Sequence, residues 1–312
     1  MAEIRFSVVI VHRNGAQMLL NALASLMRTV GSGDEIILVD NGSTDASVKQ
    51  VRAAYPAVHI IENGCNKGFA RACNQGLSAA RGEYVLFLNN DAFLPADAFD
   101  RFAEDFASFP KAALIGGQLV GEDGFPQRSA GVAPTFLSEL GLIRRKPPDV
   151  SNSPRPVEVE TLVGACMAFR RELADSAGRL DEDFFFYFEE TEWCVRLRRQ
   201  GWKVMLDPRV RITHLKGVST RAIRREAQVE MFRSRLLYYR KTMPPILAIS
   251  LSVWRVLRLL MNTVSYLLMG VLTLGLLRKV RTKLMVYLTQ LTWLLIGCPA
   301  SWGLPDKCPR QS

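Results

Sequence analysis

Residues 6–45 read FSVVIVHRNGAQMLLNALASLMRTVGSGDEIILVDNGSTD, and the order of apolar and polar stretches in this segment decides the fold. The apolar run 6–11 predicts a buried strand, and the segment 16–30 predicts a helix that ends at the glycines of 31–33. The run 35–39 predicts a second buried strand. Two buried strands joined by one helix are typical of a parallel sheet, so the segment predicts an α/β domain.

The alternation of strands and helices continues beyond this segment. Apolar runs predict strands at 58–61, 84–88, 112–119, 160–170, 202–206 and 211–214, and helices are expected at 68–80, at 95–109 and in a segment that ends near residue 54. Residues 121–156 are poorly patterned and rich in proline and glycine, which indicates loops over the mouth of a site.

Polar residues follow the predicted strands. His12 and Arg13 follow the first strand, Asp40 follows the second, and residues 89–91 (Asn-Asn-Asp) follow the fourth. Because ligands of such sheets bind beyond the carboxyl ends of the strands, we expect these side chains on one rim. The turn Asn-Lys-Gly at 66–68 opens a helix, whose free N–H groups could hold a phosphate. Neither GxGxxG nor GxxxxGK[ST] occurs, which removes the main support for dinucleotide and P-loop sites.

The stretch DEDFFFYFEETEWC at 181–194 runs from five aromatic residues into three carboxylates. Acidic residues suit the first turn of a helix, and this helix is expected to end at a glycine at 201. Glu192 faces Arg196 and should form a salt bridge. Glu190 faces apolar residues, so its pKa should be raised and it could act as a general base. The alternative is a carboxylate that the helix dipole stabilises.

Cysteine usage and the N-terminus bear on the compartment. The chain has six cysteines, at 65, 73, 166, 194, 298 and 308. They show neither CxxC spacing nor a compact framework, so we predict a reduced, cytosolic chain. The apolar run at 6–11 is far too short for a signal-peptide core or a membrane span.

The formal charge of +10 is unevenly distributed. Residues 221–283 hold thirteen Lys and Arg against two acids, a local charge of +11, so the remainder is close to neutral. A basic surface of this kind meets nucleic acid or anionic lipid. Long apolar runs interrupt the basic residues here, which favours a membrane surface and no nucleic acid.

The C-terminal region, residues 241–312, is predicted to be helical, basic and apolar. Residues 259–277 carry no charge and are long enough to span a membrane, whereas the run 284–296 is short. A single pass would place the basic residues of 278–283 outside, against the positive-inside tendency. We therefore expect helices that lie in, or dip into, the cytoplasmic leaflet. A membrane-spanning or re-entrant hairpin, or a soluble tail that forms a homodimer, are the alternatives.

Six blocks occur in a characteristic order. They are VDNGSTD (39–45), NKGFARACNQGL (66–77), YVLFLNNDA (84–92), GACMAFRRE (164–172), FFFYFEETEWCVRLRRQGW (184–202) and ITHLKGVS (212–219). This order resembles the family 2 inverting glycosyltransferases of the GT-A fold, and most closely their rhamnosyltransferase-type branch. The resemblance implies an α/β catalytic domain over residues 1–240, with a mixed, mainly parallel central sheet.

The resemblance also implies roles for individual residues. Asp40 corresponds to the acid that binds the nucleotide base, and Asn66 and Gly68 fall in the turn that lines the nucleotide. Asn90 and Asp91 belong to the DxD-type motif, in which Asp91 binds the divalent cation, Mg²⁺ or Mn²⁺. Asn89 stands where that motif has its first acid.

Two further residues match the family at sites of chemistry. Glu190 falls on the second acid of the acidic pair, the catalytic base. A lone histidine is usually structural, but His214 matches a histidine that some relatives use as a further metal ligand. The QxxRW motif of processive synthases is absent, which argues for the addition of a single sugar.

The expected activity follows from this resemblance. It is transfer of one sugar, best L-rhamnose from dTDP-L-rhamnose, to a lipid-linked saccharide acceptor in bacterial cell-surface polysaccharide synthesis. The expected location is the cytoplasmic face of the inner membrane, with peripheral or monotopic attachment. The alternatives are the same chemistry with a UDP-sugar (a hexose or GlcNAc) and a catalytically inactive GT-A domain that serves as a membrane scaffold.

Overall fold

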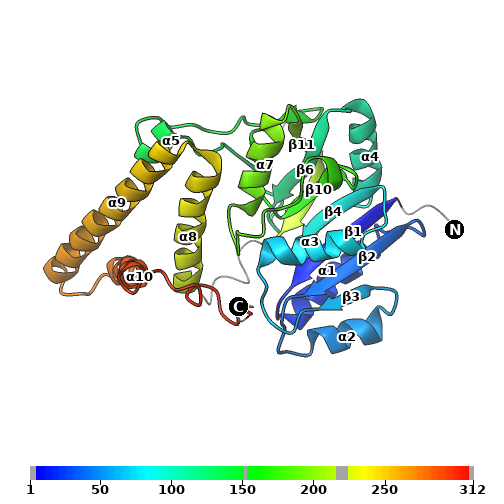
Figure 1. Cartoon of the computed structure of the whole chain (residues 1–312). Helices are drawn as coiled ribbons and strands as arrows, with labels where there is room; N and C mark the ends of the chain where they lie inside the picture. The colour runs from blue at the N-terminus through cyan, green and yellow to red at the C-terminus, as the bar shows by residue number, and fades with distance from the viewer. Residues whose placement is uncertain (1–4, 151–152, 216–223, 309–312) are drawn as a thin grey trace.

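The computed structural model describes residues 5–150, 153–215 and 224–308, and within them nine strands form one central sheet (Figure 1). The order is β3-β2-β1-β4-β10-β6-β11-β5, with β8 beside β11. The strands are β1 (Phe6–His12), β2 (Asp34–Asp40), β3 (His59–Glu62), β4 (Tyr84–Asn89), β5 (Ala92–Phe93), β6 (Ala112–Val120), β8 (Val157–Glu158), β10 (Cys166–Arg170) and β11 (Lys203–His214). A separate pair joins β7 (Ala130–Gly131) to β9 (Thr161–Leu162).

The sheet is mixed and mainly parallel, as predicted. Strands β1 to β4 pair in parallel, and β11 pairs in parallel with β6. Strand β10 lies between β4 and β6 and is antiparallel to both. The parallel half brings the carboxyl ends of β1, β2 and β4 to one edge, where the predicted polar rim lies.

Helices cover both faces of the sheet. One face carries α1 (Ala16–Leu26), α2 (Ser47–Ala54) and α4 (Ala98–Ser108), and the other carries α3 (Phe69–Ala79), α6 (Leu173–Ser176) and α7 (Glu189–Arg199). Along β1, Val8 and Ile10 enter the first core while Val9 enters the second, because successive strand side chains point to opposite faces. Burial on both sides explains the continuous apolar runs of the central strands.

Three predicted elements differ in the structure. The single strand expected at 160–170 is split into β9 and β10, because the backbone turns at residues 163–165 and Ala165 O accepts from Asn89 N. The two strands expected at 202–206 and 211–214 form the single strand β11, which has an irregular register between Asp207 and Arg211. Residues 216–219, the end of the sixth sequence block, lie outside the described residues.

The C-terminal part forms α8 (Arg224–Thr242), α9 (Pro245–Leu272) and α10 (Arg278–Leu295), and a short helix, α5 (Phe136–Leu140), packs against α9. These helices lie to one side of the sheet, and the chain then returns toward the domain (Figure 1). Among the described residues, α9 is the one helix long and apolar enough to cross a membrane, judged by length and composition. The predicted domain boundary at residue 240 falls inside α8 and stays a prediction.

Candidate active site

A cavity of about 280 Å³ lies at the edge of the sheet, beyond the carboxyl ends of β1 and β4. Five residues proposed from the sequence line it: Asn66, Gly68, Asn90, Asp91 and His214. They come from three separate regions of the chain, and the fold brings them together beyond the strand ends. Asp40 and Glu190 do not line this cavity.

Asp91 and His214 form the candidate metal pair. His214 Nε2 lies 3.4 Å from Asp91 Oδ1, and the backbone holds the pair because Leu215 N donates to Asp91 O. His214 Nδ1 has no hydrogen-bond partner among the described residues. Those residues contain no cluster of three or more metal-ligating side chains. Such a pair fits Mg²⁺ or Mn²⁺, because these ions take one or two carboxylates and complete their shell with substrate phosphates.

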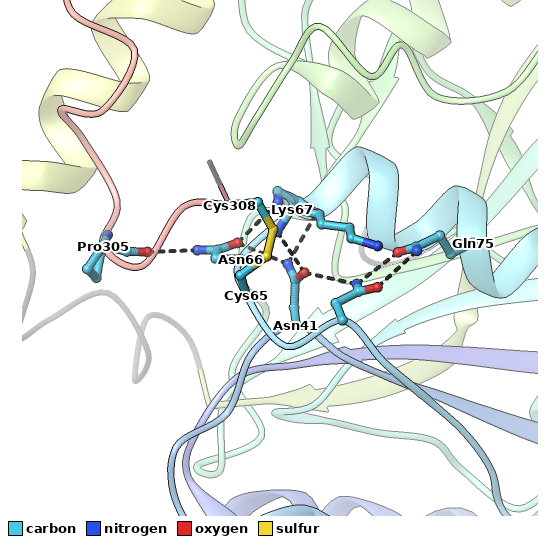
Figure 2. The surroundings of a disulfide bond; sticks show 9 residues. Asn41, Cys65, Asn66, Lys67, Gln75, Pro305 and Cys308 are labelled. Atoms are coloured by element: carbon cyan, nitrogen blue, oxygen red, sulfur yellow. Dashed lines mark hydrogen bonds between the residues drawn. A yellow bond between two sulfur atoms is a disulfide. The ribbon is translucent and has the colours of Figure 1, made fainter. Parts of the chain in front are cut away.

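The turn at 66–68 is held by a network of amides (Figure 2). Asn41 donates to Asn66 Oδ1 at 3.0 Å and accepts from the backbone N–H of Lys67 at 3.0 Å. Gly68 has φ +88°, and a Cβ there would lie 2.6 Å from the carbonyl oxygen of Phe185. Glycine is therefore required at this position, since both the backbone angle and the close approach exclude a side chain.

Aromatic residues that pack against this turn form another part of the cavity wall. Phe185, Phe186 and Tyr187 line the cavity. Tyr187 and Phe188 have φ of 71° and 70°, a left-handed conformation that costs such residues about 1–3 kcal/mol. This backbone reversal starts α7. Glu190, the second residue of that helix, therefore follows the cavity-lining Tyr187 by three positions in the sequence.

Glu190 is half-buried at the start of α7, and burial of its carboxyl group raises the pKa of that group, whereas backbone N–H groups and the charge of Arg128 lower it. Glu190 Oε2 has no hydrogen-bond partner in the described part of the chain. The carboxylate packs beside Gly164, where a Cβ would lie 3.6 Å from Glu190 Cγ. The expected salt bridge between Glu192 and Arg196 is confirmed, at 2.9 Å.

Asp40 is buried, and its carboxylate accepts from the backbone N–H of Ser43 at 3.1 Å. Its neighbour Asn41 lines the cavity in its place. His12 also lines the cavity, and burial lowers its pKa to about 4 although the charge of Asp40 raises it. His12 is therefore neutral near pH 7, with Nδ1 2.7 Å from Asn90 Nδ2.

The C-terminal tail, residues 296–308, completes the cavity and was not predicted. Leu304 and Pro305 line the cavity, and Asn66 N donates to Asp306 O at 2.8 Å. Cys308 forms a disulfide with Cys65, 243 residues earlier (Figure 2). The prediction of a fully reduced chain is therefore wrong for this pair. The two cysteines are far apart in sequence and meet only because the tail returns to the turn at 66–68.

Charged groups fasten the same tail. Asp306 forms a salt bridge with Arg13, which lines the cavity. Lys307 lies 2.7 Å from the buried carboxylate of Glu230 on α8. The tail thus connects the candidate site to the C-terminal helices through three kinds of contact: backbone hydrogen bonds, ion pairs and a covalent bond.

Cys308→Ser should lower the free energy of unfolding by about 2–4 kcal/mol, because the disulfide constrains the unfolded chain. Thermal unfolding of the full chain without reductant measures the change. Cys298→Ser is the matched control, since Cys298 is an exposed free cysteine in the same tail. The prediction is wrong if the two variants have the same thermal unfolding midpoint and a thiol reagent labels Cys65 in the unsubstituted protein.

Comparison with known proteins supports the same family. The model of "Glycosyl transferase family 2" matches residues 7–178. The chain is 27% identical over 223 residues to an N-acetylglucosaminyl-diphospho-decaprenol L-rhamnosyltransferase of Mycobacterium tuberculosis, covering 64% of this chain and 72% of that protein. It is 26% identical over 212 residues to the dTDP-rhamnosyl transferase RfbF of Shigella flexneri, covering 67% of this chain and 68% of that one.

Solved structures share the fold. The mannosyltransferase PcManGT from Pyrobaculum calidifontis, solved with GDP-Man and Mn²⁺, aligns with a TM-score of 0.55 at 17% identity. The alignment covers 93% of this chain and 86% of that one. Together with the sheet order, this likeness confirms the predicted GT-A fold.

Proposed function

The chain belongs to glycosyl transferase family 2, and from this premise we propose that it transfers a single L-rhamnose, with inversion, from dTDP-L-rhamnose to a lipid-linked saccharide. The observation that carries the proposal is the meeting of Asn66, Gly68, Asn90, Asp91 and His214 in one cavity. The names of two relatives, both rhamnosyltransferases, support the choice of sugar.

We assign each side chain one task. Glu190 removes the proton of the acceptor hydroxyl, and a raised pKa suits a base that works near neutral pH. Asp91 and His214 hold a divalent cation, which when bound steadies the departing diphosphate. Asp40 positions the turn through the backbone N–H of Ser43, beside Asn41, which lines the cavity.

The C-terminal helices attach the enzyme to the membrane that carries its acceptor. Large apolar side chains are exposed along α9, at Ile246, Ile249, Val253, Leu257, Leu260, Met261, Val264, Leu267, Leu268, Val271 and Leu272. The start of α10 carries four basic residues within 278–283. Apolar surface next to basic residues suits an interfacial helix on anionic lipid, which supports peripheral or monotopic attachment.

A panel of nucleotide sugars tests the function. We expect dTDP-L-rhamnose with Mg²⁺ or Mn²⁺ to raise the thermal unfolding midpoint more than UDP-glucose or UDP-GlcNAc does, since a bound ligand stabilises the folded state. The same donor should support transfer to a lipid-linked saccharide. If a UDP-sugar raises the thermal unfolding midpoint more and supports faster transfer, the donor is that UDP-sugar and not dTDP-L-rhamnose. No response to any donor would favour an inactive scaffold.

A further inference from the structure

A second cavity, of about 210 Å³, lies between α8, α9 and α10. Its polar lining consists of Arg255, Arg258 and Asn262 from α9, Gln228 from α8, and Tyr287 and Gln290 from α10. Three helices that contact one another thus line a polar cavity that opens to solvent, next to the exposed apolar surface of α9. The roles proposed above for the donor cavity do not use this space.

The two arginines of this cavity form no direct ion pair among the described residues. Within residues 5–150, 153–215 and 224–308, neither Arg255 nor Arg258 makes a hydrogen bond or a salt bridge, whereas the nearby Arg235 pairs with Glu139 at 3.2 Å. Burial lowers the pKa of Arg255, and the charges of Arg235 and Arg258 lower it further, against the opposing influence of Tyr239 and Glu139. An anion in the cavity would offset the free-energy cost of burying the charge of Arg255 and the repulsion between the arginines.

The spacing of the arginines suits a phosphate group. Arg255 and Arg258 are three residues apart and Asn262 follows four residues later, so all three side chains lie on one face of α9. The planar guanidinium group of arginine binds phosphate oxygens through two parallel hydrogen bonds. Gln290 donates to the backbone oxygen of Gln228 at 3.0 Å, which fixes the opposite wall.

The surroundings of the cavity suit a lipid that carries such a group. Met261, about one helical turn after Arg258 on α9, is 50% exposed. A headgroup held by Arg255 and Arg258 would therefore have its hydrocarbon chain beside the exposed apolar surface of α9. A free anion would leave that apolar surface uncovered.

We propose that this cavity binds the diphosphate of the lipid-linked acceptor, an inference that rests on the proposed function. Helix α8 separates the two cavities: Ser234 donates to the carbonyl of Phe186 at the wall of the donor cavity, while Gln228 and Phe232 face the arginines. A helix with its side chains is about 10–12 Å across. The diphosphate is thus held on the opposite side of α8 from the donor cavity, and the saccharide extends past α8 toward the donor.

Vesicle binding by the full chain tests the site. Phosphatidylcholine vesicles carry either a polyprenyl diphosphate or phosphatidylglycerol at equal charge. Arg255→Gln and Arg258→Gln should each weaken binding to the diphosphate vesicles about tenfold or more, as expected for lost charge-assisted hydrogen bonds. The control Arg281→Gln, which removes the same charge from an exposed position on α10, should change that binding much less. On phosphatidylglycerol the three variants should lose binding to a similar, small extent.

Two results would overturn the assignment. Equal losses for all three variants on diphosphate vesicles would show only general attraction to charge, and a selective loss on phosphatidylglycerol would assign the cavity to bulk anionic lipid. Arg258 is exposed, so Arg258→Gln should keep the fold, and its thermal unfolding midpoint checks this. The assay needs no donor, so failure of every nucleotide sugar would remove the proposed function and leave the vesicle result standing.

Discussion

Glu190→Gln is expected to slow sugar transfer by about 10²–10⁴-fold, because a positioned general base contributes a factor of that size. Glutamine keeps the shape of the side chain but cannot accept the proton of the acceptor hydroxyl. Donor binding should stay unchanged, since Glu190 does not line the donor cavity. Single-turnover transfer rates measure the first effect, and the thermal shift produced by the donor measures the second.

The pH profile supplies an independent readout of the same base. Burial raises the pKa of Glu190, so the carboxylate is protonated at pH values where an exposed glutamate is already ionised. The transfer rate of the unsubstituted enzyme should therefore rise with pH through that elevated pKa, and Glu190→Gln should lose this limb.

Glu192→Gln is the matched control for Glu190→Gln on the same helix. It breaks the salt bridge to Arg196, so it should affect stability and leave the pH limb of transfer in place. If Glu190→Gln retains the turnover of the unsubstituted enzyme, the base lies elsewhere.

Asp91→Asn should abolish the response of transfer to added Mg²⁺ or Mn²⁺ and should remove slow donor hydrolysis together with it. The replacement exchanges an anionic oxygen ligand for a neutral amide, and a bound metal is worth several kcal/mol of transition-state stabilisation. Transfer rates across a metal titration measure the effect.

Asp100→Asn is a suitable control for Asp91→Asn because it makes the same chemical change at an exposed carboxylate, which pairs with Arg5. It should leave the metal titration as it is in the unsubstituted enzyme. An undiminished metal response in Asp91→Asn would remove Asp91 from the metal site.

Local patterns were sufficient to predict the sheet and several residues of the cavity at its edge. Short apolar runs predict the buried strands. Ligands of such sheets bind beyond the carboxyl ends of the strands, and Asn66 and Asp91 both line the cavity there. The break at 163–165 was missed because the apolar run continues through it, so periodicity alone shows no turn. His12 was placed on the rim but given no role, because its burial and its contact with Asn90 depend on tertiary packing.

No local sequence pattern predicts that the C-terminal tail contributes to the cavity. Leu304 and Pro305 lie in a segment without clear periodicity, and Cys308 resembles any isolated cysteine when read alone. The neighbouring position of Cys65, directly before the turn at 66–68, was the one available hint, and pairing it with Cys308 needs the three-dimensional path of α8 to α10.

The bond between Cys65 and Cys308 has a practical consequence for anyone handling this enzyme. Because this bond anchors residue 308 beside the turn at 66–68, a group attached at that position would lie next to the proposed nucleotide site. A small environment-sensitive dye attached at the same end would report donor arrival through its emission.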